Sequence, residues 1–534
     1  MNQKYYRFFL IFAFSLSWIL GDTIKIPAEQ PWRNLSPGID FQIFELPDPN
    51  QVFVTRMDRS NKNVTIETGL AYDKLAYGRE TVREIVRRND DTLGYWGEKW
   101  GVRKKVIAAI NGYYFDQDTG TPWRGQAQSA WYIKRFDNFQ NGSGIVWKLN
   151  GEIFIGGCIS HPPAKQTISF ENDQSQKFNG INQERGKDQL IIYTSHYSDT
   201  TGTDNSGVEV LVEMDKPLLI GSNSTGTSGT IKQIFDHRGS STIPFNAIIL
   251  SASGTARDKL ISNVKIGQKI SISQQISHFE SDCRTPNPDN WSNAYTAIGG
   301  DFIFLKTGEI QYFDIGSANV RAPRTAVAYN DEYIYFIVVD GRDPDNSVGM
   351  SMRELAEFSK TYLDARWGIS EDSGGSSTMV INGEVVNNTY CNFNDCTQLP
   401  QTNEPGNGTS SNTSTGYQTI SESFVGNALM MVKVYPPIIS KTFTEKNIVI
   451  TNSETQLYSG PGINYTQIAS IPKFANLRIL PSYNDLDGIY AQGSFWWYVE
   501  YQGHQGWISE NNLIYGIVPA NFIFKPFFFD NRKR

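Results

Sequence analysis

Short apolar runs separated by turn residues extend from residue 32 to about residue 434, and they constrain the fold more than any other feature. Turns rich in glycine and asparagine separate the runs, a pattern typical of strands. Abundant Gly (46), Phe (31), Tyr (26) and Trp (12) among 534 residues, with only 19% charged residues, favour β-rich structure over coiled coils or helix bundles. The clearest runs are 106–110, 190–193, 208–212, 247–250, 333–339 and 378–381.

Two segments of this region predict helices, so the fold class that we expect is α+β with more strand than helix. Residues 81–88 form a short, charged segment. Residues 351–367 give the stronger signal, because Ser351 and Glu354 have the spacing of a capping box and apolar residues recur behind them at helical intervals. Gly368 stands where a glycine commonly ends a helix.

The first 21 residues have the pattern of a signal peptide. Lys4 and Arg7 precede an apolar run, Phe8 to Leu20, which is too short to span a bilayer and suits the core of an export signal. Cleavage near Gly21 would release the chain outside the cytoplasm, and an uncleaved anchor is the alternative. We therefore expect a secreted or cell-envelope protein.

Composition divides the rest of the chain. We expect one domain over residues 32–434, with a polar surface loop at 402–416, and then a linker at 435–446. A small all-β module follows at 447–516, and a tail at 517–534. The aromatic run 522–529 in this tail favours a final strand or a frayed end over a contact with a membrane surface.

Residue counts exclude several kinds of site. Five scattered His and four Cys argue against zinc, iron–sulfur or Ser-His chemistry, so no metal or cofactor is predicted, although a divalent cation stays an open option. A net charge of −7 without a basic cluster in the body of the chain argues against nucleic acid as a partner. In an exported chain the cysteines become disulfide candidates, and Cys391 with Cys396 would close a small loop. Cys158 with Cys283 is a further option, because four Cys allow three pairings.

Residues 299–383 concentrate the candidate chemistry. Asp340 and Asp372 each follow the end of a strand or helix and stand close to glycine, and Arg324 and Arg342 lie in the same segments. Carboxylates can act at a sugar carbon, and an arginine fork binds phosphate oxygens. The run Gly374–Ser376 can present successive backbone N–H groups to an anion. Each motif alone would be interpreted as an ordinary turn, but together they indicate cleavage of a bond between a sugar and a phosphate.

The order of short motifs along the chain resembles that of the phosphodiester glycosidase family, which includes N-acetylglucosamine-1-phosphodiester α-N-acetylglucosaminidase. The motifs lie at residues 111–115, 323–326, 340–342, 349–355 and 372–376, and weaker ones extend the resemblance over about 32–434. The resemblance implies an α+β domain that removes a GlcNAc-like sugar from a sugar-phosphodiester glycan. An exopolysaccharide or another envelope glycan is the substrate class that this implies.

The resemblance also implies roles for individual residues. Asp340 and Asp372 become the catalytic candidates, and the sequence does not decide which of them acts at the anomeric carbon. The candidates for binding substrate or phosphate are Arg324, Thr325, Asn111, Arg342, Gly374, Gly375 and Ser376.

Two residues depart from the family pattern, in which the loop is usually Asp-Gly-Gly-Gly-Ser. Ser373 replaces the first glycine, and it would force a different backbone angle if a positive φ were required there. Glu371 replaces an apolar residue, and it could raise the pKa of Asp372 if both face the same cavity. These departures keep open the alternative of a non-catalytic protein that binds cell wall or polysaccharide on the same fold.

The C-terminal module resembles a bacterial SH3-like domain through residues 457–462, 464–465, 496–499 and 506–508. Such a resemblance implies a bacterial source, and either binding of peptidoglycan or a cell-wall peptide, or a role as a spacer. Strand alternation predicts that one of Trp496 and Trp497 points inward, so only the other would be free to line a groove.

Overall fold

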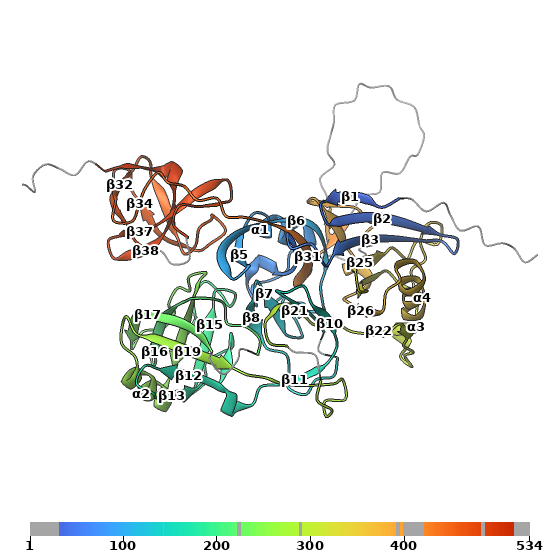
Figure 1. Ribbon diagram of the computed structural model, residues 1–534, viewed down its shortest axis with the longest axis horizontal. Coiled ribbons are helices and arrows are strands. Elements are labelled where there is room, and N and C mark those ends of the chain that lie inside the picture. Colours follow the sequence, from blue (N-terminus) through green and yellow to red (C-terminus); the bar gives the residue numbers. More distant parts are fainter. Residues whose placement is uncertain are drawn as a thin grey trace, which may run out of the picture.

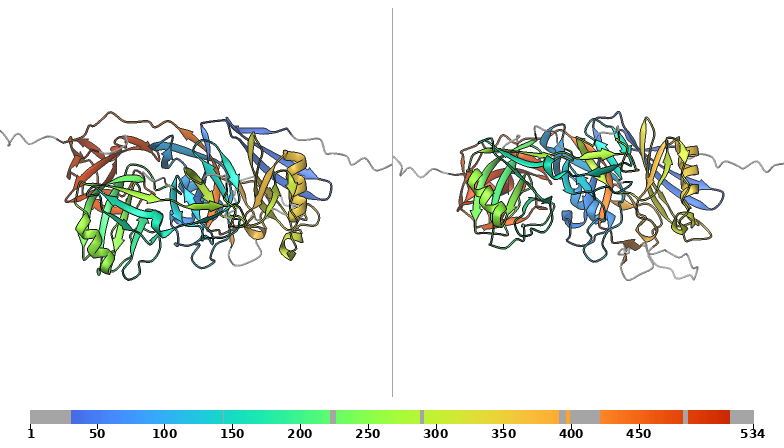
Figure 2. Two further views of the ribbon diagram at one scale, coloured as in Figure 1. Left: turned by 60° about the horizontal axis from the view of Figure 1, so that its bottom comes forward. Right: turned by 90° about the horizontal axis from the view of Figure 1, so that it is seen from below.

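A computed structural model describes residues 31–142, 144–221, 226–287, 291–390, 396–398, 421–481 and 486–516. The described residues contain far more strand than helix, as the sequence predicts, and the strands pair almost entirely in antiparallel fashion (Figure 1). Figures 1 and 2 show one sheet with its helices at one end of the molecule, two smaller sheets in the middle, and two further β units side by side at the other end. The predicted signal peptide, the polar loop 402–416 and the tail 517–534 lie outside the described residues. Among the helices that the structure describes, none is long and apolar enough to cross a membrane.

The first sheet carries helices on one face. Its strands lie in the order β1-β2-β3-β25-β24-β26-β22-β23, and helix α4 (Met352–Leu363) and the short helix α3 (Gly316–Asn319) cover it. Alternate residues of the central strands face this helix or the main core on the other side. The strands are β1 Arg33–Ser36, β2 Ile39–Leu46, β3 Asn50–Asp58, β22 Ile303–Lys306, β23 Glu309–Ile310, β24 Arg324–Tyr329, β25 Tyr333–Val339 and β26 Trp367–Ser370.

Both predicted helices are confirmed, but α4 ends earlier than the sequence predicts. Helix α1 (Val82–Asn89) and α4 each begin with a capping box. Helix α4 stops at Leu363, because Asp364 adopts a left-handed conformation with φ 49°. Gly368, expected at the helix end, lies instead in β26, where a Cβ atom would come within 2.3 Å of the Phe304 ring. This glycine therefore allows close packing of a strand and does not cap the helix.

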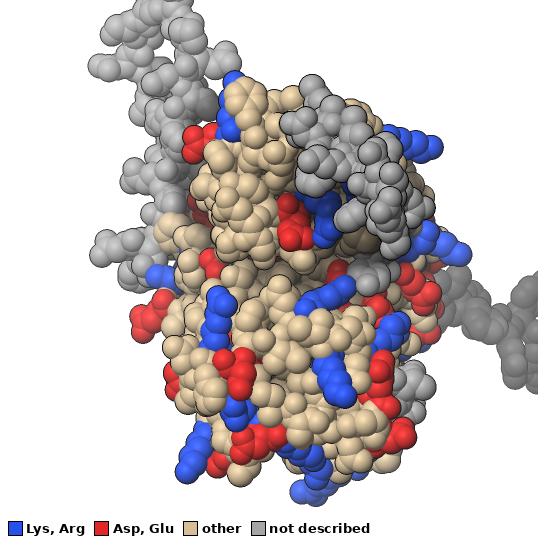
Figure 3. Space-filling view, turned by 90° about the vertical axis from the view of Figure 1, so that its left-hand side faces the viewer, with Lys and Arg blue, Asp and Glu red and all other residues tan. Residues whose placement is uncertain are grey.

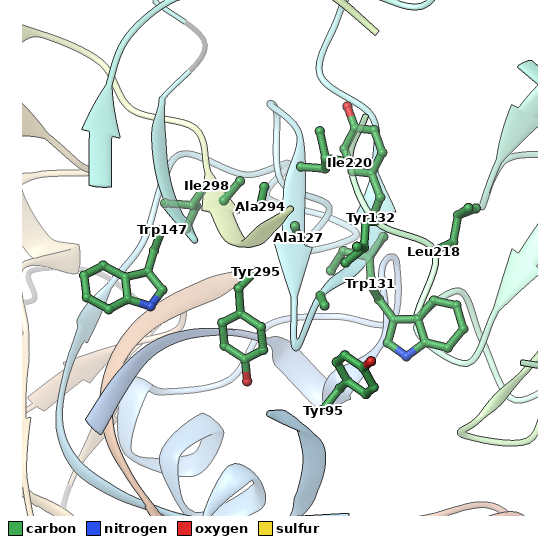
Figure 4. Close-up of a cluster of buried hydrophobic side chains, with 14 of the residues drawn as sticks. Tyr95, Ala127, Trp131, Tyr132, Trp147, Leu218, Ile220, Ala294, Tyr295 and Ile298 are labelled. Atoms are coloured by element: carbon green, nitrogen blue, oxygen red, sulfur yellow. The ribbon is translucent and has the colours of Figure 1, made fainter. Parts of the chain in front are cut away.

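Two smaller sheets pack face to face in the middle of the molecule. Figure 4 shows Trp147, Tyr295, Ala127 and Trp131 in the buried cluster of this region. One sheet has the order β28-β27-β6-β31-β4 with β5 beside β6, and the other has the order β10-β9-β21-β7-β8. Their strands are β4 Val64–Leu70, β5 Leu93–Trp96, β6 Lys99–Asn111, β27 Met379–Ile381, β28 Glu384–Val385, β31 Asn427–Tyr435, β7 Gln126–Gln128, β8 Trp131–Lys134, β9 Ile145–Lys148, β10 Ile153–Ile155 and β21 Ala294–Ile298.

Residues 166–274 form a separate eight-stranded sheet that the sequence analysis did not distinguish from the surrounding domain. The two chain segments that lead into and out of it pair as β11 (Cys158–Ser160) and β20 (Ser277–Phe279), and the disulfide Cys158–Cys283 joins them. The predicted Cys391–Cys396 pair involves Cys391, which lies outside the described residues. The strands of this insert are β12 Gln166–Phe170, β13 Ser175–Lys177, β14 Gly180–Ile181, β15 Leu190–Thr194, β16 Val208–Met214, β17 Thr227–Asp236, β18 Ala247–Ala252 and β19 Lys269–Gln274, with helix α2 Gly254–Asn263.

The C-terminal module (residues 448–515) is one antiparallel sheet in the order β34-β33-β38-β37-β35-β32-β39, with β36 beside β37. Its likeness to an SH3-like domain stays a prediction. Figure 3 shows the end of the molecule where this module and the insert lie, with acidic and basic side chains interspersed. The strands are β32 Ile448–Thr451, β33 Thr455–Tyr458, β34 Gln467–Ile471, β35 Asn476–Ile479, β36 Ile489–Ala491, β37 Ser494–Tyr501, β38 His504–Ser509 and β39 Leu513–Tyr515.

Both tryptophans of β37 are buried, whereas the sequence analysis left one of them free to line a groove. Trp497 packs in the core of the module, and Trp496 packs in the core that the module shares with the rest of the chain; each is 2% exposed. Phe245 of the insert reaches across, with its ring 5.5 Å from that of Tyr465 and 5.3 Å from that of Trp507. An aromatic face of the module is therefore covered by the same chain.

Candidate active site

The candidate residues gather where strands of two sheets end. Arg324 begins β24, Asp340 follows β25 and Asp372 lies two residues after β26. The pairing of Arg324 with Val339 puts the start of β24 beside the end of β25, and β26 ends one strand away in the same sheet. Asn111, the last residue of β6, brings the end of a central sheet to the same place. Segments that are distant in the sequence therefore meet at one edge.

Asn111 ties these segments together. Its side-chain oxygen accepts hydrogen bonds from Thr325 Oγ1 at 2.7 Å and from the Thr378 backbone N–H at 3.2 Å, while Nδ2 donates to the Asp372 carbonyl at 2.7 Å. Asn111 and Thr325 are fully buried. The sequence analysis named both as candidates for binding substrate. The structure instead encloses them in the protein, where they hold the Asp372 loop against β24.

Asp372 is the buried carboxylate at the centre of the site. Ser376 Oγ donates to its Oδ2 at 2.7 Å, and the Ser373 backbone N–H also hydrogen-bonds to it. Burial, with a smaller contribution from the charge of Asp301, raises the pKa of Asp372 to about 6. A carboxyl with such a pKa exchanges its proton near neutral pH, as acid–base catalysis requires.

Asp340 is also buried, and burial raises its pKa to about 6. Both of its oxygens are already in use, because Asn387 Nδ2 donates to Oδ1 at 3.0 Å and the Asn388 N–H donates to Oδ2 at 2.9 Å. Asn387 in turn donates to the Ser377 carbonyl at 3.1 Å. Asp340 is thus placed to support the loop that follows Asp372, and the charge that acts on it is that of Asp343.

Two residues near Asp372 were missed as site candidates. Asp301 lies after β21, and burial raises its pKa, against the charges of Arg124 and Arg324. Burial raises the pKa of Tyr114 far above its ordinary value, and the negative charges of Asp372 and Asp301 raise it further. Tyr114 therefore presents a neutral hydroxyl beside two carboxyl groups. Tyr114 lies in the motif 111–115 and Asp301 follows Gly299-Gly300, but nothing local distinguishes either residue as part of a site.

Glu371, next to Asp372 in the chain, is a fully buried acidic residue. It is 0% exposed, and neither side-chain oxygen has a hydrogen-bond partner among the described residues. Burial, and then the charges of Asp301 and Asp372, raise the pKa of Glu371 well above its ordinary value. The pKa of Asp372 is indeed raised, but burial and Asp301 raise it and Glu371 does not. A Glu371 side chain that keeps its proton has no charge with which to repel Asp372.

The backbone at residue 373 suits serine. Ser373 has φ −120° and ψ 178°, which is ordinary extended backbone, whereas Gly374 has φ 78°. The expected distortion by Ser373 is therefore absent, and the position that favours glycine is 374. This result removes Ser373 as a ground for the non-catalytic alternative.

Two arginines lie close together beside the loop. Arg324 is buried, and it donates from Nε to the Met350 carbonyl at 2.7 Å and from Nη2 to the carbonyls of Ser317 and Val320. Burial lowers the pKa of Arg324, and the charge of Arg342 lowers it further. Arg342 is exposed and lies against Gly374, where a Cβ atom would come within 3.0 Å of its Nη2.

Neither arginine forms an ion pair with a carboxylate in the part of the chain that the structure describes. Arg342 instead lies over the ring of Tyr390 at 5.4 Å. Two neighbouring guanidinium groups without a carboxylate partner attract an anion such as phosphate.

The loop Gly374–Ser376 forms one turn of 3-10 helix, and its Gly374 N–H donates to the Pro323 carbonyl at 3.0 Å. The backbone N–H of Gly375 has no hydrogen-bond partner among the described residues, whereas the N–H of Ser376 belongs to the 3-10 turn. Ser423 Oγ fixes the far side of the loop by donating to the Gly375 carbonyl at 2.8 Å. Of the three predicted amides, that of Gly375 therefore remains available to an anion. In the described parts of the chain, no three His, Cys, Asp or Glu side chains are arranged to hold a metal ion.

Comparison with known protein families identifies part of the chain. Residues 231–400 match the model of the phosphodiester glycosidase family. The matched segment includes Asp301, Arg324, Asp340 and Asp372 but not Asn111, and it covers less than half of the chain. It is thus narrower than the resemblance over 32–434 that the motifs predict. No curated protein matches the chain.

Two solved structures are similar at low sequence identity. A hypothetical protein from Synechocystis is 14% identical with a TM-score of 0.44, and the alignment covers 76% of this chain and 64% of that protein. The catalytic domain of zebrafish N-acetylglucosamine-1-phosphodiester α-N-acetylglucosaminidase, auto-inhibited by its pro-peptide, is 13% identical with a TM-score of 0.33. That alignment covers 76% of this chain and 86% of the zebrafish domain.

Proposed function

We propose that this protein is a secreted or envelope glycosidase that hydrolyses a sugar-1-phosphodiester, GlcNAc-like, in an extracellular glycan. The observation that carries the proposal is a buried Asp372 with a pKa of about 6 on the same short loop that meets Arg342 and the neighbouring Arg324. The family match over residues 231–400 supports the same reaction class.

In this reaction water cleaves the bond between the anomeric carbon and the phosphate oxygen, and it yields a free sugar and a phosphomonoester. The phosphate is a good leaving group, so charge stabilisation can replace a strong general acid. We assign that stabilisation to Arg324, Arg342 and the backbone amide of Gly375. Asp372 then acts as the carboxylate at the anomeric centre.

Tyr114 and Asp301 complete the acid cluster in this proposal. The Tyr114 hydroxyl stays protonated, because its pKa is raised by burial and by the nearby carboxylates. It can therefore donate a hydrogen bond to a sugar or phosphate oxygen throughout the physiological pH range. Asp301 is held close to Arg124 and Arg324, whose charges act against the effect of burial.

The test is hydrolysis of UDP-GlcNAc and of a synthetic α-GlcNAc-1-phosphodiester by the chain without residues 1–21. We expect release of free sugar by the wild type and a loss of at least about a hundredfold in Asp372→Asn, the range for removal of an acid–base group. Asp331→Asn is the matched control, because Asp331 is an exposed aspartate at the other end of β24 and β25. Full activity in Asp372→Asn would contradict the assignment.

Binding of peptidoglycan or a cell-wall peptide through the C-terminal module stays a separate prediction. The contacts of Phe245 with Tyr465 and Trp507 argue against this face as the binding surface while the module is docked. Retention of the protein on purified cell wall, compared with a Phe245→Ala variant, measures whether the module binds wall and whether docking hinders it.

A further inference from the structure

One aromatic side chain beside the acid cluster is turned to solvent. Trp123 is 59% exposed, whereas most large apolar side chains of the described residues are buried. Its ring stacks on that of Tyr114, with centroids 5.8 Å apart and planes inclined by 25°. An exposed indole next to a candidate catalytic centre has a free apolar surface with which to meet a ligand.

The hairpin that carries Trp123 is well ordered by its own hydrogen bonds. The Trp123 N–H donates to the Tyr114 carbonyl at 2.9 Å, and the Asp116 N–H donates to the Thr121 carbonyl at 2.8 Å. At the turn, the Asp116 carboxylate accepts bonds from the Thr119 N–H and hydroxyl, each at 2.9 Å. The backbone that carries Trp123 is therefore fixed by these bonds, and the indole rests on the Tyr114 ring, so less freedom is lost when a ligand binds.

Tyr114 connects this ring to the reacting groups. Its hydroxyl experiences the charges of Asp372 and Asp301 and that of Arg324. Trp123 thus lies one ring beyond the acid cluster. Arg342 and Gly374, in contrast, lie beside the loop that follows Asp372. The site consequently has an aromatic part at Tyr114 and a cationic part at Arg342.

We propose that Trp123, supported by Tyr114, is the platform on which a pyranose ring of the substrate stacks. One face of a pyranose carries C–H groups, which are attracted to the electron-rich face of an indole and which lose little by leaving water. The phosphate is then left to the two arginines. This inference rests on the proposed function and adds to it the residue that recognises the sugar.

The experiment measures binding of three probes to the whole chain: N-acetylglucosamine, N-acetylglucosamine 1-phosphate and inorganic phosphate. The variants are Trp123→Ala, which removes the platform, and Trp123→Phe, which keeps an aromatic face. Phe474→Ala is the matched control, since Phe474 is an aromatic side chain that is 68% exposed in the C-terminal module. Dissociation constants are combined with acrylamide quenching of tryptophan fluorescence, which reports whether a sugar covers Trp123.

We expect Trp123→Ala to weaken binding of the two sugars about tenfold, equivalent to about 1.4 kcal/mol, and to leave phosphate binding unchanged. Trp123→Phe should lose less. Sugar should protect the fluorescence of the wild type from acrylamide, and this protection should disappear in Trp123→Phe. A Trp123 that only supports Tyr114 would give no such protection.

Sugar binding that is equal in the wild type and Trp123→Ala, or undetectable in the wild type, would overturn the proposal. The outcome is distinct from that of the proposed function. A chain that binds sugar through Trp123 without hydrolysing any phosphodiester would retain this inference and lose the enzyme. If activity depends on Asp372 but sugar affinity does not depend on Trp123, the proposed function stands and this inference is wrong.

Discussion

Replacement of Glu371 by glutamine is expected to flatten the dependence of protein stability on pH. Glu371 is completely buried and its carboxyl has no hydrogen-bond partner among the described residues, so ionisation inside the fold is strongly disfavoured. Burial, and then the charges of Asp301 and Asp372, raise its pKa well above the ordinary value of 4.5. Glutamine has nearly the same shape and does not titrate.

The sign follows from proton binding. Above pH 4.5 the unfolded chain releases the Glu371 proton, while the folded protein keeps it up to the raised pKa. Rising pH therefore favours unfolding, by about 1.4 kcal/mol per pH unit in that window. The contribution of Glu371 to the free energy of unfolding is therefore complete at low pH and is lost as the pH rises. Above pH 4.5 the free energy of unfolding of Glu371→Gln should therefore rise relative to that of the wild type as the pH increases.

The assay is denaturant unfolding of both proteins at pH 5, 6 and 7 at constant ionic strength. Asp340 and Asp372 also have raised pKa values, of about 6, but they titrate in both proteins and cancel in the difference. Glu332→Gln, the same substitution at an exposed glutamate, is the control. A flat difference for Glu371→Gln would refute the claim that Glu371 is protonated inside the fold.

The other predictions concern the docked module, the loop and the pH profile. Phe245→Ala should weaken the docking of the C-terminal module by roughly 3 kcal/mol, the usual cost for a buried phenylalanine, and should speed proteolysis within residues 436–446. Phe474→Ala, at an exposed position, should not change the rate of proteolysis. Equal cleavage of the two variants would rule out the docking. Ser373→Gly should change activity less than about twofold, because the backbone there is extended, whereas Gly374→Ala should cost about 1–2 kcal/mol of stability and most activity because φ is 78°; a large gain from Ser373→Gly would be incompatible with this geometry. Activity should rise as pH increases through about 6, where Asp372 ionises, and a profile that falls there would assign Asp372 the opposite proton role.

Local signals in the sequence predict the elements of this fold well. The strands at 190–193 and 333–339 and the capping box of Ser351 and Glu354 reappear in the structure, because alternation and capping depend on neighbouring residues. The predicted end of α4 was wrong, because it depends on a contact that is distant in the sequence. Gly368 has the local pattern of a helix cap, but a glycine is needed there because the Phe304 ring packs against it.

The candidate site was predictable only in part. Arg324, Asp340 and Asp372 stand in short motifs, and the structure brings the ends of their strands together. Asp301 and Tyr114 join them through packing between sheets, which no local pattern records. Burial also decides which candidate residues can face the substrate and which support the site, and the sequence alone does not report burial.

The separate sheet at 166–274 and its contact with the C-terminal module are likewise non-local. Strand pairing over this insert joins residues more than a hundred positions apart, for example Gln166 with Gln274, and periodicity alone cannot report such partners. Phe245 looks like an ordinary apolar residue in the sequence, and only the fold brings it to Tyr465 and Trp507.

The most direct test of the central claim is to identify which bond is broken. A GlcNAc-1-phosphodiester is hydrolysed in water enriched in ¹⁸O, and the phosphomonoester product is examined by mass spectrometry or ³¹P NMR. Attack at the anomeric carbon leaves the phosphate product unlabelled, and the account predicts this result for the wild type. It also predicts that Asp372→Asn loses the hydrolysis. Incorporation of ¹⁸O into the phosphate would mean attack at phosphorus, and it would contradict the assignment of Asp372 to the sugar.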